Sequence, residues 1–115
     1  MNQNRKDRFA RNEASFRSIN ETLGESLSTI GVEVGELAAF VCECGHPECS
    51  QLVQLPLPDY ERIRGDSRRF LIVPGHDIPG VEDVVDTTAR FAVVQKHEDV
   101  RDIVEASDAR RDDFR

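Results

Sequence analysis

The sequence predicts an α+β fold, and three observations support this prediction. A long segment near the N-terminus has apolar residues at helical spacing, and several short segments further along have the composition of β-strands. Three cysteines lie close together between two of those strand-like segments. The 115 residues suffice for one domain of ordinary size. We therefore expect an N-terminal helix, a small and mainly antiparallel sheet, and short helices.

The first element is an amphipathic helix, which the pattern predicts from about Arg8 to Ile30, with Gly31 as its end. Residues 1–7 are predicted to be disordered. Apolar side chains recur every three or four positions along the helix, and we call this set the apolar stripe: Phe9, Phe16, Ile19, Leu23, Leu27 and Ile30. We expect the helix either to pack on its own domain or to contact a partner protein or a second copy of the chain.

Four later segments are rich in β-branched or aromatic residues and are predicted to be strands. They are residues 37–42, 51–55, 70–73 and 91–95. The first two flank the cysteines, so we expect them to pair as a hairpin.

Three short helices are predicted in the same part of the chain, the first two from proline and glycine positions and the third from the helical spacing of Val100, Ile103 and Val104. They are residues 58–64, the segment that begins at Pro79, and residues 98–106. In the second of these, Val81, Val84 and Val85 lie at i, i+3 and i+4, which is a helical spacing. The expected organisation is a helix with a basic arm, an α+β domain and a polar tail, at residues 1–30, 37–106 and 107–115.

The cysteines form the motif C-x-C-x4-C at Cys42, Cys44 and Cys49. Residues i and i+2 of an extended chain point to the same side, so the first two sulfurs can face one way. Gly45 and Pro47 favour a tight reversal, which brings the third sulfur beside them. Zinc takes four tetrahedral ligands from thiolates and imidazoles. The motif therefore predicts a zinc site, and the hairpin becomes a zinc knuckle.

The fourth ligand has to come from elsewhere, and His76 is the favoured candidate. It lies in a Pro-Gly turn directly after an apolar strand, where a ligand can be held rigidly. His46 inside the loop, His97 further along, a carboxylate or a water molecule are alternatives. Other readings of the cysteines are an iron–sulfur cluster, a redox pair of Cys42 with Cys44, or buried thiols that bind no metal.

The net charge of −7 is unevenly distributed along the chain. Residues 1–17 carry five basic and two acidic side chains, whereas the remainder carries 10 basic and 20 acidic ones. The acidic remainder of the chain repels the phosphate groups of nucleic acids, but the basic arm could still contact them locally. The chain has neither the roughly 20-residue apolar run of a membrane helix nor a secretory signal. We expect a cytoplasmic protein, and in that compartment three cysteines favour metal binding over disulfides.

Four segments carry a resemblance to other proteins: Arg11–Arg17, Val41–Cys44, Leu55–Arg64 and Arg69–His76. With these segments the chain resembles a group of small proteins of actinobacterial type for which no activity is established, over most of residues 11–97. The resemblance implies that the cysteine loop and the Pro-Gly-His turn belong together, which favours His76 as the fourth ligand.

The expected function is that of a non-catalytic zinc-binding module that mediates protein interaction through its N-terminal helix, in a regulatory role. Thiolate-rich zinc sites are mostly structural, and the chain has no phosphate-binding loop, nucleophile elbow or metalloprotease motif. One alternative is nucleic-acid binding through the basic arm. The other is a small zinc hydrolase with an open metal position, in which Glu43, Glu48 or Asp77 would be the nearby carboxylate.

Overall fold

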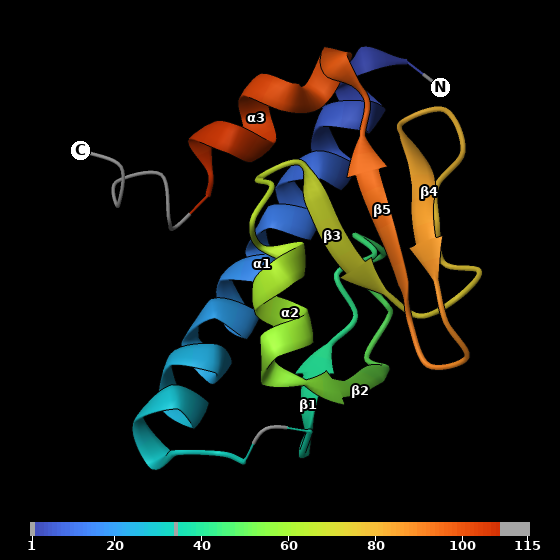
Figure 1. Cartoon of the computed structure of the whole chain (residues 1–115). Helices are drawn as coiled ribbons and strands as arrows, with labels where there is room; N and C mark the ends of the chain where they lie inside the picture. The colour runs from blue at the N-terminus through green and yellow to red at the C-terminus, as the bar shows by residue number, and fades with distance from the viewer. Residues whose placement is uncertain (1, 34, 109–115) are drawn as a thin grey trace.

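The computed structural model describes residues 2–33 and 35–108, and these have the predicted α+β class (Figure 1). In chain order the elements are α1 (Gln3–Ile30), β1 (Leu37–Val41), β2 (Leu52–Pro56), α2 (Leu57–Ile63), β3 (Arg69–Ile72), β4 (Glu82–Thr87), β5 (Ala92–Lys96), the 3-10 helix η1 (Glu98–Val100) and α3 (Arg101–Ala106). Most of the predicted tail lies outside the described residues. Among the described residues, no helix is long and apolar enough to cross a membrane.

The strands form two small antiparallel sheets. β1 and β2 pair as the predicted hairpin, with Phe40 opposite Val53. The second sheet has the order β3-β5-β4, with β5 in its centre. The two sheets meet just beyond β1, where the N–H of Glu43 donates to the carbonyl oxygen of Leu71 in β3 at 2.7 Å. The loop between β1 and β2 carries the cysteines, and the connection between β3 and β4 carries His76.

Six of the seven predicted short elements agree closely with the structure. The exception is the predicted helix after Pro79, which is wrong because that segment contains the strand β4. The pairing of β4 with β5 shifts register between Val84 and Asp86, as at a β-bulge. Strand β4 lies at the edge of its sheet, and all its residues after Glu82 are exposed, including Val84 and Val85. The i, i+3 and i+4 spacing of Val81, Val84 and Val85 therefore occurs here where a strand begins and does not indicate a helix.

The helix α1 begins at Gln3, so the prediction of disorder at residues 1–7 is wrong for those that the structure describes. The side chain of Asn2 caps the helix by accepting a hydrogen bond from a first-turn N–H at 2.9 Å. Lys6 forms an ion pair of 2.8 Å with Asp99 of η1. The first turns of α1 are therefore stabilised by the N-terminal cap and by an ion pair with η1.

Helix α1 packs on its own domain, but through a polar face and not through the apolar stripe. Its buried residues are Ala10, Glu13, Ala14, Arg17, Asn20, Glu21 and Gly24. In the stripe, Ile19, Leu23 and Ile30 are exposed to 48%, 36% and 78%. Phe16 and Leu27 are half-buried. Helical periodicity identified the apolar face correctly, but that face is turned largely to the outside.

The polar face of α1 can be buried because its charges meet partners from distant segments. The ammonium group of Lys96 in β5 lies between the carboxylates of Glu13 and Glu82, and all three side chains are fully buried. The carboxylate of Glu21 pairs with the guanidinium of Arg64, which is also buried. A buried charge is tolerated where it is paired in this way.

Arg17 completes the polar face with a different kind of contact. Its guanidinium donates to the carbonyl oxygens of Ser67 and Val104 at 2.5 and 2.7 Å. The same group lies 4.3 Å from the centre of the Phe70 ring, which is a cation–π distance. Helix α1 is thus tied to β3 and α3 as well as to β5.

The apolar core lies between the two sheets and α2. Its largest fully buried apolar side chains are Phe40, Leu55, Tyr60, Phe70, Leu71 and Ile72. The rings of Phe40 and Tyr60 are stacked with their centres 4.4 Å apart. Tyr60 of α2 therefore belongs to the core.

Candidate metal centre

The cysteine loop, residues 42–49, follows β1 directly and continues its extended conformation. The N–H of Cys42 still donates across the hairpin, at 3.0 Å. The chain therefore places Cys42 and Cys44 on one side. Gly45 then turns the chain with a φ of 81°, and a backbone hydrogen bond of 3.0 Å in the following turn returns Cys49 beside them.

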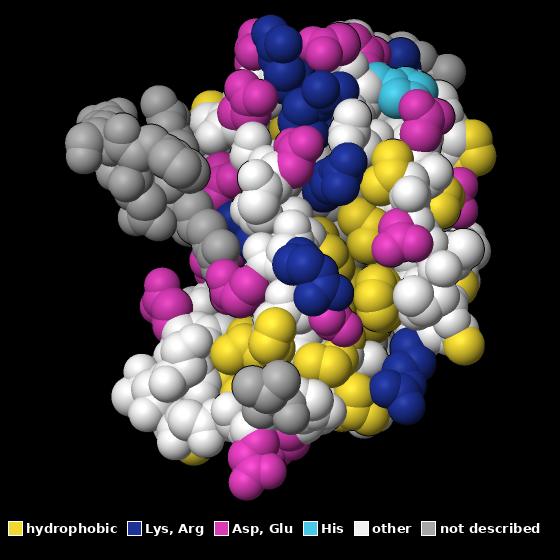
Figure 2. Space-filling model, in the orientation of Figure 1, with side chains coloured by type: hydrophobic (Ala, Val, Ile, Leu, Met, Phe, Trp, Pro, Cys, Tyr) yellow, Lys and Arg dark blue, Asp and Glu magenta, His cyan; other side chains and the backbone are white. Residues whose placement is uncertain are grey.

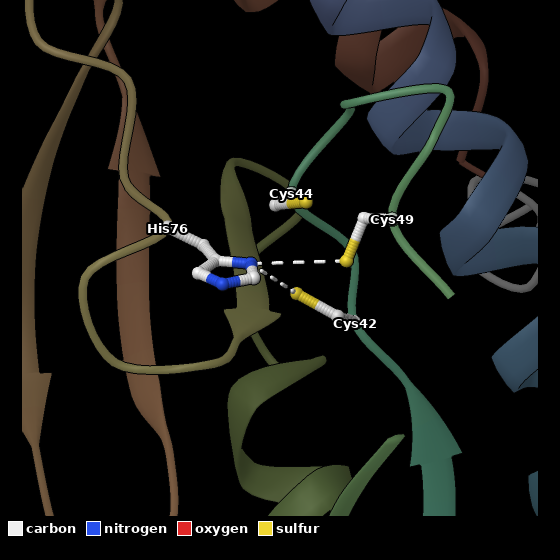
Figure 3. Close-up of side chains that lie close together, drawn as sticks. All are labelled: Cys42, Cys44, Cys49 and His76. Atoms are coloured by element: carbon white, nitrogen blue, oxygen red, sulfur yellow. Dashed lines mark hydrogen bonds between the residues drawn. The ribbon is translucent and has the colours of Figure 1, made fainter. Parts of the chain in front are cut away.

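The structure brings the four predicted ligands together (Figure 3). One ligand atom from each of Cys42, Cys44, Cys49 and His76 lies within 4.8 Å of the others. The Nδ1 atom of His76 is 3.7 Å from the sulfur of Cys42 and 3.7 Å from that of Cys49. A tetrahedral zinc ion with bonds of about 2.3 Å to sulfur and about 2.0 Å to nitrogen separates such atoms by about 3.6 Å. The four residues therefore fit a tetrahedral cation, with Nδ1 as the histidine ligand.

Val73 positions both halves of the site. Its N–H donates to the sulfur of Cys42 at 3.2 Å, and its carbonyl oxygen accepts from the N–H of His76 at 3.0 Å. The first bond stabilises negative charge on a ligand sulfur, and the second closes the turn that presents the imidazole. The end of β3 therefore holds one ligand from each of the two segments.

The thiols of the cluster differ in acidity. Hydrogen bonding, most of all with the Cys42 side chain and then with the backbone at His46 and the side chains of His76 and Cys49, lowers the pKa of Cys44 to about 4, although burial opposes the shift. The same hydrogen bond and burial raise the pKa of Cys42. Thiolate is the form that binds a metal, so the lowered pKa of Cys44 favours metal binding by this cluster.

The other two histidines lie elsewhere in the structure. The ring of His46 is exposed and meets the ring of Phe9 edge to face, with centres 5.4 Å apart. The Nε2 atom of His97 is 3.2 Å from a carboxylate oxygen of Asp83. Within the described residues, the group of possible metal ligands includes His76 and neither of the alternatives.

The carboxylate of Glu43 points away from the cysteine sulfurs and into the fold. It accepts hydrogen bonds from Nδ2 of Asn20 at 2.7 Å and from the hydroxyl of Tyr60 at 3.0 Å. It also accepts from the N–H of Leu71 at 2.9 Å. Burial raises the pKa of this carboxyl group, and the hydrogen bonds oppose that shift. Glu43 joins α1, α2 and β3, which is a structural role that the sequence interpretation missed.

The cysteine loop also rests directly on α1. The side chain of Asn12 donates to the carbonyl oxygen of Gly45 at 3.0 Å. Asn20 both donates to and accepts from the backbone of Val41, at 2.8 Å each. A methyl group added at Gly45 would lie 2.8 Å from Cγ of Glu13. The spacing of eight residues between the two asparagines, which puts them on one helix face, was the only sequence signal for this contact.

A cavity of about 460 Å³ opens on the half-buried side of the site. Its lining residues are His46, Glu48, Cys49, Ser50, Gln51, Gly75 and His76. Cys49 and His76 are half-buried, whereas Cys42 and Cys44 are buried. One side of the site is therefore reached from solvent and the other is covered by protein.

The basic arm is partly used inside the fold. Lys6 pairs with Asp99, and Arg17 is buried. On the face shown in Figure 2, the dark blue Lys and Arg side chains are interspersed with magenta Asp and Glu side chains. The described residues on this face form no continuous basic surface of the kind that phosphate backbones contact.

Comparison with protein-family models, with curated proteins and with solved structures finds no match for this chain.

Proposed function

We propose that this chain is a structural zinc protein and that it acts as a protein-interaction module. One zinc ion is held by Cys42, Cys44, Cys49 and His76. The observation that carries the proposal is the convergence of four zinc-type ligand atoms within 4.8 Å of one another. Three thiolates and one imidazole complete a tetrahedral shell, which is the composition of structural zinc sites.

The position of the site supports a structural role. Its ligands come from the loop of the hairpin and from the turn after β3, so the metal joins the two sheets at the point where they meet. Structural zinc contributes about 10–16 kcal/mol of apparent binding free energy in zinc-finger peptides. Glu43, the carboxylate between two ligands, is committed to internal hydrogen bonds and is fully buried, so it is not available as a general base.

The exposed part of the apolar stripe supports the interaction role. Ile19, Leu23 and Ile30 are held on a helix whose opposite, polar face is locked into the domain. An exposed apolar row on a rigid helix suits contact with an apolar groove of a partner protein or with a second copy. In this function zinc orders the loop on which α1 rests, and α1 presents the contact surface.

The zinc proposal is tested by native mass spectrometry of protein purified without added metal. We expect one zinc ion per wild-type chain and loss or weakening of that zinc in His76→Ala. The matched control is His97→Ala, which removes a histidine outside the cluster and should retain one zinc. Equal zinc retention in both variants would contradict the assignment of His76.

The interaction proposal is tested with a double variant, Ile19→Ser with Leu23→Ser, whose changes lie on the exposed surface of α1. Glu25→Gln, an exposed change outside the stripe, is the control. We expect the double variant to keep its zinc and its unfolding midpoint but to lose self-association in sedimentation or a partner captured by crosslinking. If sedimentation and crosslinked partners are the same in all three proteins, the stripe is not an interaction surface.

A further inference from the structure

We propose that Cys49 is a site of oxidation by hydroperoxides, and that its oxidation releases the zinc ion. This inference rests on the proposed zinc site and adds a mode of regulation to it. It comes from two features on the same side of the site: the half-buried sulfur ligand and the cavity that opens onto it.

Access distinguishes Cys49 from the other two cysteines. Cys42 and Cys44 are 2% and 0% exposed, and the sulfur of Cys42 also accepts a hydrogen bond from the N–H of Val73. Cys49 is half-buried and lines the cavity of about 460 Å³ together with His76. A hydroperoxide needs far less space than this cavity offers, so it can reach the sulfur of Cys49 without movement of the fold.

The chemistry begins with a zinc-bound thiolate, because thiolate and not thiol is the nucleophile. The sulfur of Cys49 attacks one oxygen of the hydroperoxide. The S–O bond forms, the O–O bond breaks, and hydroxide or alkoxide leaves. Cys49 becomes a sulfenic acid, oxidised by two electrons, and the peroxide is reduced by the same two electrons. The sulfenic acid is a poor ligand, so zinc keeps only three strong protein ligands.

A second thiolate then completes the reaction. The sulfurs of Cys42 and Cys44 both lie within 4.8 Å of the sulfur of Cys49. Either thiolate attacks the sulfur of Cys49, an S–S bond forms, the S–O bond breaks and hydroxide leaves. The disulfide removes a second ligand, and zinc dissociates. The overall balance is two thiolates and one hydroperoxide converted to one disulfide, with two hydroxide equivalents and one zinc ion released.

The experiment uses the full chain in its zinc-bound form, with hydrogen peroxide as the oxidant. Zinc release is followed with a chromogenic chelator, and dimedone is present in a parallel sample to trap sulfenic acid. A glutamate-specific protease cuts after Glu43 and after Glu48, so each cysteine falls in a different peptide for mass spectrometry. We expect the first dimedone adduct at Cys49. Without dimedone, we expect a disulfide between Cys49 and Cys42 or Cys44, and one zinc released for each disulfide formed.

Cys49→Ser provides a second test, because it removes the reactive sulfur and leaves three ligands. Zinc release by peroxide should be slower than in wild type by an order of magnitude or more. If this variant binds no zinc, the order of dimedone labelling in wild type decides the question alone.

The outcomes separate this inference from the zinc proposal. Wild-type protein that holds no zinc before oxidation overturns both. Zinc that is bound but stays bound while peroxide is consumed overturns the inference only, as does a first adduct at Cys42 or Cys44. Zinc release with no change in the mass of any cysteine-containing peptide overturns it as well.

Discussion

The carboxylate of Glu43 offers the sharpest test of how the fold supports the site. It lies between two proposed zinc ligands in the sequence, yet it accepts hydrogen bonds only from inside the fold, from Asn20, Tyr60 and Leu71. Glu43→Gln keeps the shape of the side chain but replaces one acceptor oxygen with an NH₂ group. The change therefore tests whether the three donors need a carboxylate.

The cost of this variant follows from the geometry. If the new NH₂ group takes the place of Oε2, it meets the donor Nδ2 of Asn20, whose amide cannot flip because it also bonds both backbone groups of Val41. If it takes the place of Oε1, it meets the N–H of Leu71. Either orientation leaves a buried donor without its acceptor, which costs about 1–3 kcal/mol. We expect the free energy of unfolding to fall by about that amount.

The assay is urea unfolding of the zinc-bound protein, with zinc counted by mass spectrometry. Glu48→Gln is the matched control, because Glu48 lies in the same loop, is exposed, and should be replaceable with a change of at most about 0.5 kcal/mol. Both variants should retain one zinc ion. Equal stability of Glu43→Gln and wild type, or loss of zinc without loss of stability, would refute this account of Glu43.

Three further variants test the buried polar face and its contact with the loop. Burial and the Glu82 carboxylate raise the pKa of Glu13 although Lys96 lowers it, so ionisation of Glu13 opposes folding once the pH exceeds the unfolded value of about 4.3. Glu13→Gln should therefore gain stability relative to wild type as the pH rises from about 4 to about 8, and a difference in stability that stays constant over this range in urea titrations would contradict this. Gly45→Ala and Gly80→Ala both place alanine at positive φ, 81° and 93°, at a cost of about 1–2 kcal/mol. Only at Gly45 does the added methyl group also contact α1, so the unfolding midpoint of Gly45→Ala should fall further than that of Gly80→Ala. Equal midpoints of the two variants would show that the loop does not pack tightly against the helix.

The cysteine site was largely predictable because its geometry is local. Cys42 and Cys44 face one side through the alternation of an extended chain, and Gly45 allows the reversal that returns Cys49. His76 was predicted as the fourth ligand from its position in a turn after a strand and from the resemblance. Because His76 lies far from the cysteines in the sequence, His46 and His97 remained alternative fourth ligands. The fold decides between them, because it brings the ring of His76 beside the cysteine sulfurs.

Which face of α1 is buried could not be predicted from the periodicity of its apolar residues. Hydrophobic spacing assumes that apolar residues turn inward and charged ones outward. In this fold Glu13 is buried because Lys96, eighty-three residues later, supplies a charge, and Asn20 is buried because the backbone of Val41 supplies both its partners. Such pairings depend on the tertiary structure, and hydrophobic periodicity does not predict them.

The central claim is that one zinc ion has three sulfur ligands and one nitrogen ligand. X-ray absorption at the zinc edge, on protein purified without added metal, measures that shell directly. The account predicts three Zn–S distances of about 2.3 Å and one Zn–N distance of about 2.0–2.1 Å, with the nitrogen contribution lost in His76→Ala. A shell with fewer than three sulfurs, an oxygen-rich shell, or protein without zinc would contradict it.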